Sequence, residues 1–146
     1  MKSERRPAFW DSSALVPLLC RDAYSVRSRE LLRRFPLIVV WWNTPVETHS
    51  AIVRLLKENR LNAEGAGKAL SYLQKFRLRW REIQPVDKVR DGAEDCLDRF
   101  RIRSAGALQL AAARVWCKNI PRNHPFICFD SELSDAARQS GFDVHS

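Results

Sequence analysis

The stretch that most constrains the fold is the run PLIVVWW at residues 36–42, which is apolar throughout and rich in β-branched side chains. A run of this composition is typical of a strand that is buried on both faces of a sheet. It is also far shorter than the roughly 20 apolar residues that a membrane-spanning helix needs. We therefore expect a sheet with helices packed on both sides of this strand, in a protein that does not span a membrane.

Short apolar runs alternate with helical patterns along the rest of the chain. The apolar runs predict strands at residues 7–11, 36–42, 82–86, 125–129 and 142–144, the third at a sheet edge because it contains a proline. The stretches between them predict helices at 12–20, 24–35, 43–59, 62–81, 86–100, 104–116 and 131–140. This alternation predicts an α/β fold, a three-layer sandwich whose central, mainly parallel sheet lies between helices. Residues 1–146 contain no linker or repeat and should form a single domain.

Serine and glycine residues mark where some of the helices should begin and end. Ser12 or Ser13 can cap the first helix, and Ser104 can cap the sixth. Gly141 should end the last helix.

The chain is basic, with 25 Lys and Arg against 17 Asp and Glu and a formal net charge of +8. Such a charge favours a polyanionic partner, either a nucleic acid or an acidic protein. A basic surface that is merely solvated is the alternative.

The four cysteines, Cys20, Cys96, Cys117 and Cys128, are far apart and show no CxxC spacing. Their apolar or helical surroundings predict buried, reduced thiols, as in a cytosolic protein. Asp11 interrupts the first apolar stretch and so does not suit a signal peptide. We therefore expect a soluble, cytoplasmic protein.

Acidic side chains follow the predicted strands near the points where they end. Asp11 follows the first strand and Asp130 the fourth, while Glu47 lies one turn into the helix after the second strand. In open α/β sheets, ligands bind in the crevice beyond the carboxyl ends of the strands. If the first and fourth strands are neighbours, the three carboxylates should meet in that crevice.

A divalent cation is the simplest means of holding three carboxylates together in a basic protein. Oxygen ligands without a His or Cys cluster favour Mg²⁺ or Mn²⁺ over Zn²⁺, and such an ion can activate a water and stabilise charge on a phosphoryl group. Alternatively, Asp11 and Asp130 cap the helices that follow them, and Glu47 compensates a helix dipole, with no ligand involved. The residue types alone leave both interpretations open.

Four segments in order resemble the motifs of PIN-domain ribonucleases, in particular the VapC-type toxins of bacterial toxin–antitoxin pairs. The segments are FWDSSALVPLL at 9–19, TPVETHSAI at 44–52, RIRSAGALQLAAA at 101–113 and FICFDSELSDAARQSGFDV at 126–144. The resemblance spans almost the whole chain. It implies a PIN-like fold, cleavage of RNA that depends on Mg²⁺ or Mn²⁺, inhibition by a cognate antitoxin, and assembly as a homodimer.

By this resemblance, the catalytic residues and metal ligands are Asp11, Glu47 and Asp130. Ser12, beside Asp11, is similar to a hydroxyl that supports a ligand or faces the substrate, although it is equally placed to cap a helix. The third motif departs from the family pattern, because Gly106 stands where such proteins usually carry an aspartate.

Gly106 suits neither the motif nor the helix, because glycine costs up to about 1 kcal/mol relative to alanine in a helix and brings no charge to its first turn. The missing carboxylate should weaken metal binding and slow cleavage. Three explanations are open. Another oxygen ligand, from Glu132 or a water, completes the site; the protein is a natural relative that does not cleave; or Gly106 is an inactivating change.

A basic segment at residues 68–82 interleaves cationic and aromatic side chains, and it places Lys75, Arg77, Arg79 and Arg81 close together. The cations could contact RNA phosphates while an aromatic ring stacks on an unpaired base. Alternatively, the apolar members belong to the core, and the arginines receive an acidic segment of the antitoxin.

Other hydrolytic chemistries lack the residues that they need. The sequence pattern brings no two histidines together, contains no nucleophile elbow and shows no glycine-rich phosphate loop. We therefore expect a metal-dependent endoribonuclease toxin. The alternative is a PIN-like module that binds RNA or an antitoxin without cleaving. A plain α/β domain whose acids only cap helices is the third possibility, and it predicts no metal binding.

Overall fold

The computed structural model describes residues 5–146. Its centre is a five-stranded sheet in the order β3-β2-β1-β4-β5, in which neighbouring strands are parallel. The strands are β1 (Ala8–Trp10), β2 (Ile38–Trp41), β3 (Arg81–Ile83), β4 (Pro125–Ile127) and β5 (Asp143–His145). The predicted strands therefore form, and the third lies at an edge as expected. β1 and β4 are neighbours, which is the arrangement that the meeting of Asp11 and Asp130 requires.

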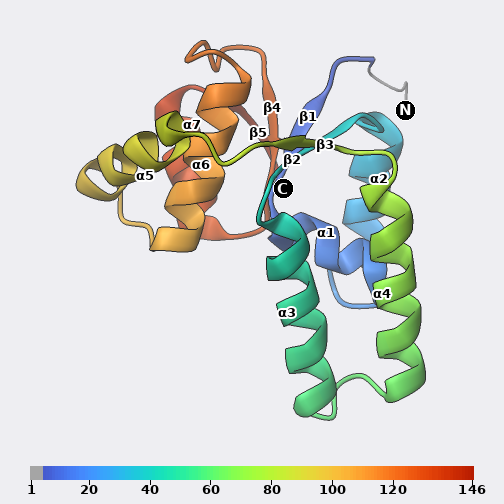
Figure 1. Ribbon diagram of the computed structural model, residues 1–146. Helices are drawn as coiled ribbons and strands as arrows, with labels where there is room; N and C mark the ends of the chain where they lie inside the picture. The colour runs from blue at the N-terminus through green and yellow to red at the C-terminus, as the bar shows by residue number, and fades with distance from the viewer. Residues whose placement is uncertain (1–4) are drawn as a thin grey trace.

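The helices cover both faces of the sheet, as Figure 1 shows. They are α1 (Ser12–Leu19), α2 (Ser25–Arg34), α3 (Thr44–Lys57), α4 (Ala63–Arg77), α5 (Asp87–Arg99), α6 (Ser104–Trp116) and α7 (Ser131–Ser140). One face packs against α5, α6 and α7, and the other against α1, α2 and α4. Helices α3 and α4 lie side by side as an antiparallel pair that extends beyond the sheet (Figure 1). The predicted α/β sandwich is confirmed, with a sheet that is parallel throughout.

The central strand β2 shows why helices are needed on both sides. Successive side chains of a strand point to opposite faces of a sheet. Val39 and Trp41 belong to the core beneath α5, α6 and α7, whereas Ile38 and Val40 belong to the core on the other face. All four are buried, as the apolar run at 36–42 predicts.

Of the caps that the sequence left open for the first helix, the structure has the aspartate. The N-cap of this helix is Asp11, not Ser12 or Ser13, because the Asp11 carboxylate accepts a hydrogen bond from the backbone N–H of Ser13. A carboxylate two residues before a free N–H at a helix start is well placed for this bond. Because Asp11 makes the capping bond, both serine hydroxyls are available for other partners.

The start of α6 differs from the prediction, whereas the end of α7 agrees with it. Helix α6 begins at Ser104 itself, so the capping position falls on Arg103, whose side chain makes no capping bond. Gly106 is therefore in the first turn of α6, as expected. Gly141 ends α7 with a left-handed φ of 102°, a conformation that favours glycine.

The four cysteines are free thiols. Cys96, Cys117 and Cys128 are buried as predicted, while Cys20 is partly exposed. Within residues 5–146, no helix combines the length and the apolar character that a membrane crossing requires.

Candidate active site

A hollow of about 750 Å³ lies beyond the carboxyl ends of β1, β2 and β4. Asp11, Glu47 and Asp130 all line it, and so does Gly106. The three acids come from the start of α1, the first turn of α3 and the start of α7. The structure therefore brings to one hollow one position from each of the four segments that resemble PIN motifs.

Asp11 is the buried member of the site, with 4% of its surface exposed. Its Oδ2 accepts the N–H of Ser13 at 3.1 Å and lies 3.7 Å from the Sγ of Cys128. Burial raises the pKa of Asp11, and the nearby charge of Asp130 raises it further, against the hydrogen bonds of Ser13. Burial also raises the pKa of Cys128 to about 12, so this thiol stays protonated and can donate to the carboxylate.

Glu47 is held by hydrogen bonds from two other helices. Ser12 Oγ donates to Glu47 Oε2 at 3.0 Å, and Gln109 Nε2 lies 3.2 and 3.3 Å from the two carboxylate oxygens. Partial burial and then the charge of Asp11 raise the pKa of Glu47 to about 7, although both hydrogen bonds act in the opposite direction. Ser12 therefore supports Glu47 and does not cap the helix.

Asp130 is exposed at the edge of the hollow and is the N-cap of α7. Its Oδ1 accepts the backbone N–H of Leu133 at 2.8 Å. Asp11 caps α1 in the same manner, through its Oδ2. Among residues 5–146, Oδ1 of Asp11 and Oδ2 of Asp130 have no hydrogen bond, so each aspartate can cap a helix with one oxygen and offer the other to a ligand.

Within residues 5–146, the acids of this site are not neutralised by direct ion pairs. In the part of the chain that the structure describes, none of Asp11, Glu47 and Asp130 forms an ion pair with Lys, Arg or His. Oxygen donors with uncompensated charge suit a hard dication such as Mg²⁺ or Mn²⁺. However, the described residues include no group of three His, Cys, Asp or Glu side chains close enough to hold an ion. The site therefore suits a hard dication in the type of its donor atoms and in its charge. The three carboxylates are not close enough in this structure to bind one ion together.

Gly106 leaves room beside these acids. A Cβ atom at this position would make ordinary contacts, at 3.8 Å to Ile102 Cβ and 3.9 Å to Leu133 Cδ1. A Cβ atom therefore fits here without displacing the backbone. Glu132, the side chain considered as a replacement ligand, is exposed in the first turn of α7 and is not among the residues that line the hollow.

Gln109 is a site residue that the sequence did not reveal. It lies on α6 one turn after Gly106, it is fully buried, and its Nε2 also donates to Thr44 Oγ1 at 3.1 Å. Its Oε1 is buried without a hydrogen-bond partner in the described residues. A lone amide inside the apolar stretch SAGALQLAAARVW was the signal that could have identified it, because a buried polar side chain needs a specific partner.

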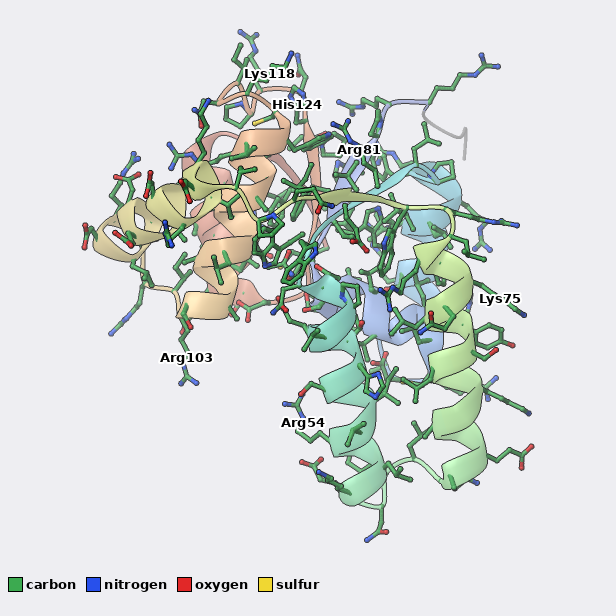
Figure 2. All side chains as sticks on the ribbon, in the orientation of Figure 1. Arg54, Lys75, Arg81, Arg103, Lys118 and His124 are labelled. Atoms are coloured by element: carbon green, nitrogen blue, oxygen red, sulfur yellow. The ribbon has the colours of Figure 1, made fainter. Side chains whose placement is uncertain are left out.

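Two arginines, Arg54 and Arg103, line the acidic hollow. Figure 2 shows Arg54 extending from α3 and Arg103 from the start of α6, on the same side of the molecule. The four cations predicted to bind RNA do not line this hollow: they are exposed on α4, in the turn after it and on β3, namely Lys75, Arg77, Arg79 and Arg81. Their role in RNA binding stays a prediction. Arg77 lines a neighbouring groove that shares Arg54 with the acidic hollow.

The parallel sheet between two layers of helices defines a PIN-like α/β sandwich. No protein-family model matches the sequence, and no curated protein matches it either. The similarity is found among solved structures, and it confirms the fold that the four motifs implied.

Three solved structures illustrate this similarity. VapC20 from Mycobacterium tuberculosis, a sarcin–ricin loop cleaving toxin, is 20% identical, covers 88% of this chain and 94% of its own, and has a TM-score of 0.63. PAE2754 from Pyrobaculum aerophilum is 18% identical, with 94% and 88% covered and a TM-score of 0.59. FitAcB from Neisseria gonorrhoeae is 14% identical, with 95% and 96% covered and a TM-score of 0.64.

Proposed function

We propose that this protein is a metal-dependent endoribonuclease toxin of the PIN type. The observation that carries the proposal is the pair of uncompensated carboxylates, Asp11 and Glu47, in a hollow beyond the strand ends that Asp130 also lines. One structural neighbour supports the same activity, since VapC20 is a toxin that cleaves the sarcin–ricin loop.

In this proposal, Asp11, Glu47 and Asp130 would hold Mg²⁺ or Mn²⁺, and the ion would supply an activated water and stabilise charge on the phosphoryl group. The protein's own side chains prepare this site. Ser12 and Gln109 fix the Glu47 carboxylate by hydrogen bonds from α1 and α6. The helix caps likewise fix one oxygen of each aspartate.

The cations around the hollow would bind the substrate. Arg54 and Arg103 line the same space as the carboxylates, so they are placed to attract the phosphates that flank the scissile bond. The net charge of +8 strengthens this attraction over longer distances.

A second candidate function is a PIN-like module that binds RNA or an antitoxin without cleaving. Gly106 favours this alternative, because the hollow lacks a carboxylate at this position and Glu132 does not line it. Both candidates share the fold and the basic surface, and they differ in whether a bound RNA is cut.

We also propose the partners that the resemblance implies: an RNA substrate and a cognate antitoxin for a cytoplasmic homodimer. Size-exclusion chromatography with light scattering measures the oligomeric state directly, and a monomer at all concentrations tested would contradict the homodimer.

Cleavage of a structured RNA that contains a sarcin–ricin-type loop tests the function. We expect cleavage with Mn²⁺ and none with EDTA. Asp11→Asn should abolish cleavage, whereas Asp98→Asn, which changes an exposed acid on α5, should cleave like the parent. Cleavage that persists in EDTA or in Asp11→Asn would contradict the proposal, and RNA binding without cleavage by the parent would favour the non-cleaving module.

A further inference from the structure

An aromatic pair, formed by the exposed Tyr24 and the partly buried Phe129, lines the acidic hollow. The rings of Tyr24 and Phe129 are stacked, with centroids 5.0 Å apart and planes at 19°. Tyr24 is 54% exposed although it is a large aromatic residue. The same two residues line both the acidic hollow and a neighbouring hollow of about 440 Å³. The pair therefore forms the boundary between two open spaces on the surface.

The backbone beneath Tyr24 is fixed by a short hydrogen-bonded turn. The Tyr24 N–H donates to Asp22 Oδ1 at 2.7 Å, and the Asp22 N–H donates to Ser25 Oγ at 2.8 Å. Ser25 Oγ in turn donates to the carbonyl of Cys20 at 3.2 Å. Because Ser25 is buried, this turn holds Tyr24 at the start of α2 in a defined position.

Phe129 is tied to the acids themselves. Its N–H donates to Ser13 Oγ at 2.9 Å, and the Ser13 N–H donates to Asp11 Oδ2 at 3.1 Å. Phe129 also directly precedes Asp130 in the chain. The stacked pair is thus placed relative to two of the candidate ligands by covalent and hydrogen bonds.

Cations lie on both sides of the pair. Arg54 and Arg103 line the acidic hollow, and Arg27 and Arg138 line the neighbouring one. Arg27 and Arg138 each pair with an acid three residues away on the same helix. Surface pairs of this kind are weak, so a phosphate can compete for both guanidinium groups.

We propose that Tyr24 is a stacking platform for an unpaired nucleobase of single-stranded or loop RNA, next to the phosphate that lies in the acidic hollow. The strand then continues across Tyr24 toward Arg27 and Arg138. Proteins recognise single-stranded RNA by stacking its exposed bases on aromatic rings beside cations that contact the phosphates. This inference rests on the proposed function, since it names the substrate class of the same site.

RNA fits this surface better than a protein segment does. The platform opens directly onto the carboxylates, where a cleavable polymer has to run, and arginines continue beyond it at the far side.

Binding of a fluorescent single-stranded RNA in the Asp11→Asn background tests the platform without cleavage. Tyr24→Ala should weaken binding roughly 5- to 100-fold, whereas Tyr24→Phe should keep it, because the ring alone stacks. Leu97→Ala is the control, since Leu97 is an exposed apolar side chain on α5 that lies outside both hollows and outside the basic segment 68–82. Arg27→Ala combined with Arg138→Ala should reduce the salt dependence of binding.

The same variants, made in the parent background, separate the two proposals. If Tyr24→Ala loses RNA affinity but the parent never cleaves with Mn²⁺, the platform stands and the nuclease proposal fails. If the parent cleaves and Tyr24→Ala binds and cleaves RNA as well as the parent does, the platform is overturned, and a protein segment becomes the occupant to consider. A 2-aminopurine base whose fluorescence is quenched by the parent but not by Tyr24→Ala locates the stacked nucleotide and supports the inference.

Discussion

Gln109 Nε2 lies 3.2 and 3.3 Å from the two carboxylate oxygens of Glu47, and this contact joins α6 to the first turn of α3 inside the candidate active site. Gln109 is fully buried and stands one turn after Gly106. The helix that lacks the family's carboxylate therefore still reaches the site, through a neutral amide that orients another acid.

Gln109→Leu removes this amide while keeping a side chain of similar size. Glu47 then loses one of the two donors that lower its pKa and fix its position. We expect Mn²⁺ affinity and RNA cleavage to fall roughly 10- to 100-fold, the usual effect of losing a group that orients a metal ligand. Gln139→Leu, on the exposed side of α7, is the control. Calorimetric titration with Mn²⁺ measures the affinity, and an unchanged value would show that Gln109 has no role in the site.

Gly106→Asp restores the carboxylate that the family motif carries. The position accepts a Cβ at ordinary contact distances, so the fold should tolerate the change. We expect tighter Mn²⁺ binding and cleavage that is faster by about tenfold or more. Gly106→Asn has nearly the same shape without the charge and should gain neither. Equal behaviour of the two variants in titration and cleavage assays would rule out a lost ligand as the meaning of Gly106.

Glu47 should make the metal-free protein sensitive to pH. Its pKa rises from 4.5 to about 7 on folding, so the folded state binds more protons than the unfolded state between these values. The free energy of unfolding therefore falls as the pH rises through this window, and it stays low above it. In EDTA we expect Glu47→Gln to have a Tm a few degrees above that of the parent at about pH 8, and a much smaller difference at about pH 4.5.

Two controls accompany this pH experiment. Glu94→Gln removes an exposed acid on α5 and should leave the pH dependence of the parent intact. Mn²⁺ should stabilise the parent at about pH 8 more than it stabilises Glu47→Gln, because only the parent keeps the ligand. If the Tm of the parent in EDTA does not fall between about pH 5 and about pH 8, folding does not raise the pKa of Glu47.

Replacing either of two glycines by alanine should change the free energy of unfolding, in opposite directions. Gly141 ends α7 at a φ of 102°, and an added Cβ would lie 3.2 Å from Pro121 Cγ, so Gly141→Ala should lower the free energy of unfolding by about 1 kcal/mol or more. Gly67 lies inside α4 with nothing within 4 Å of an added Cβ, so Gly67→Ala should raise that energy by roughly 0.5–1 kcal/mol. Urea unfolding measures both changes in the free energy of unfolding. If both variants were stabilised or both destabilised, the backbone conformation at these glycines would not explain the effects.

The fold could be predicted because its signals are local. The run at 36–42 is apolar on both faces and so requires two helix layers, and the alternation of elements requires a parallel sheet. Asp11 and Asp130 could be placed together because both follow strands, and parallel strands end at the same edge. Glu47 could be placed with them because it lies one turn into the helix that follows the second strand.

The hydrogen-bond partners of these acids could not be predicted, because they depend on how distant elements pack. Gln109 is 62 residues from Glu47, and Phe129 is 116 residues from the Ser13 hydroxyl that holds its N–H. The Tyr24–Phe129 stack joins the start of α2 to the segment before α7, and neither residue stands out in its own stretch of sequence. The sequence also left the cap of α1 open between Asp11 and the two serines, because carboxylate and hydroxyl caps have nearly equal preference.

Asp11 and Asp130 each cap the start of a helix with one carboxylate oxygen, and the other oxygen remains available for a ligand. Selection for folding alone would therefore retain both residues in a descendant that had stopped cutting RNA. Survival of these two acids in a homologue says little about whether it is toxic. The informative positions are those that contribute nothing to the scaffold, and residue 106 is the first of them to inspect.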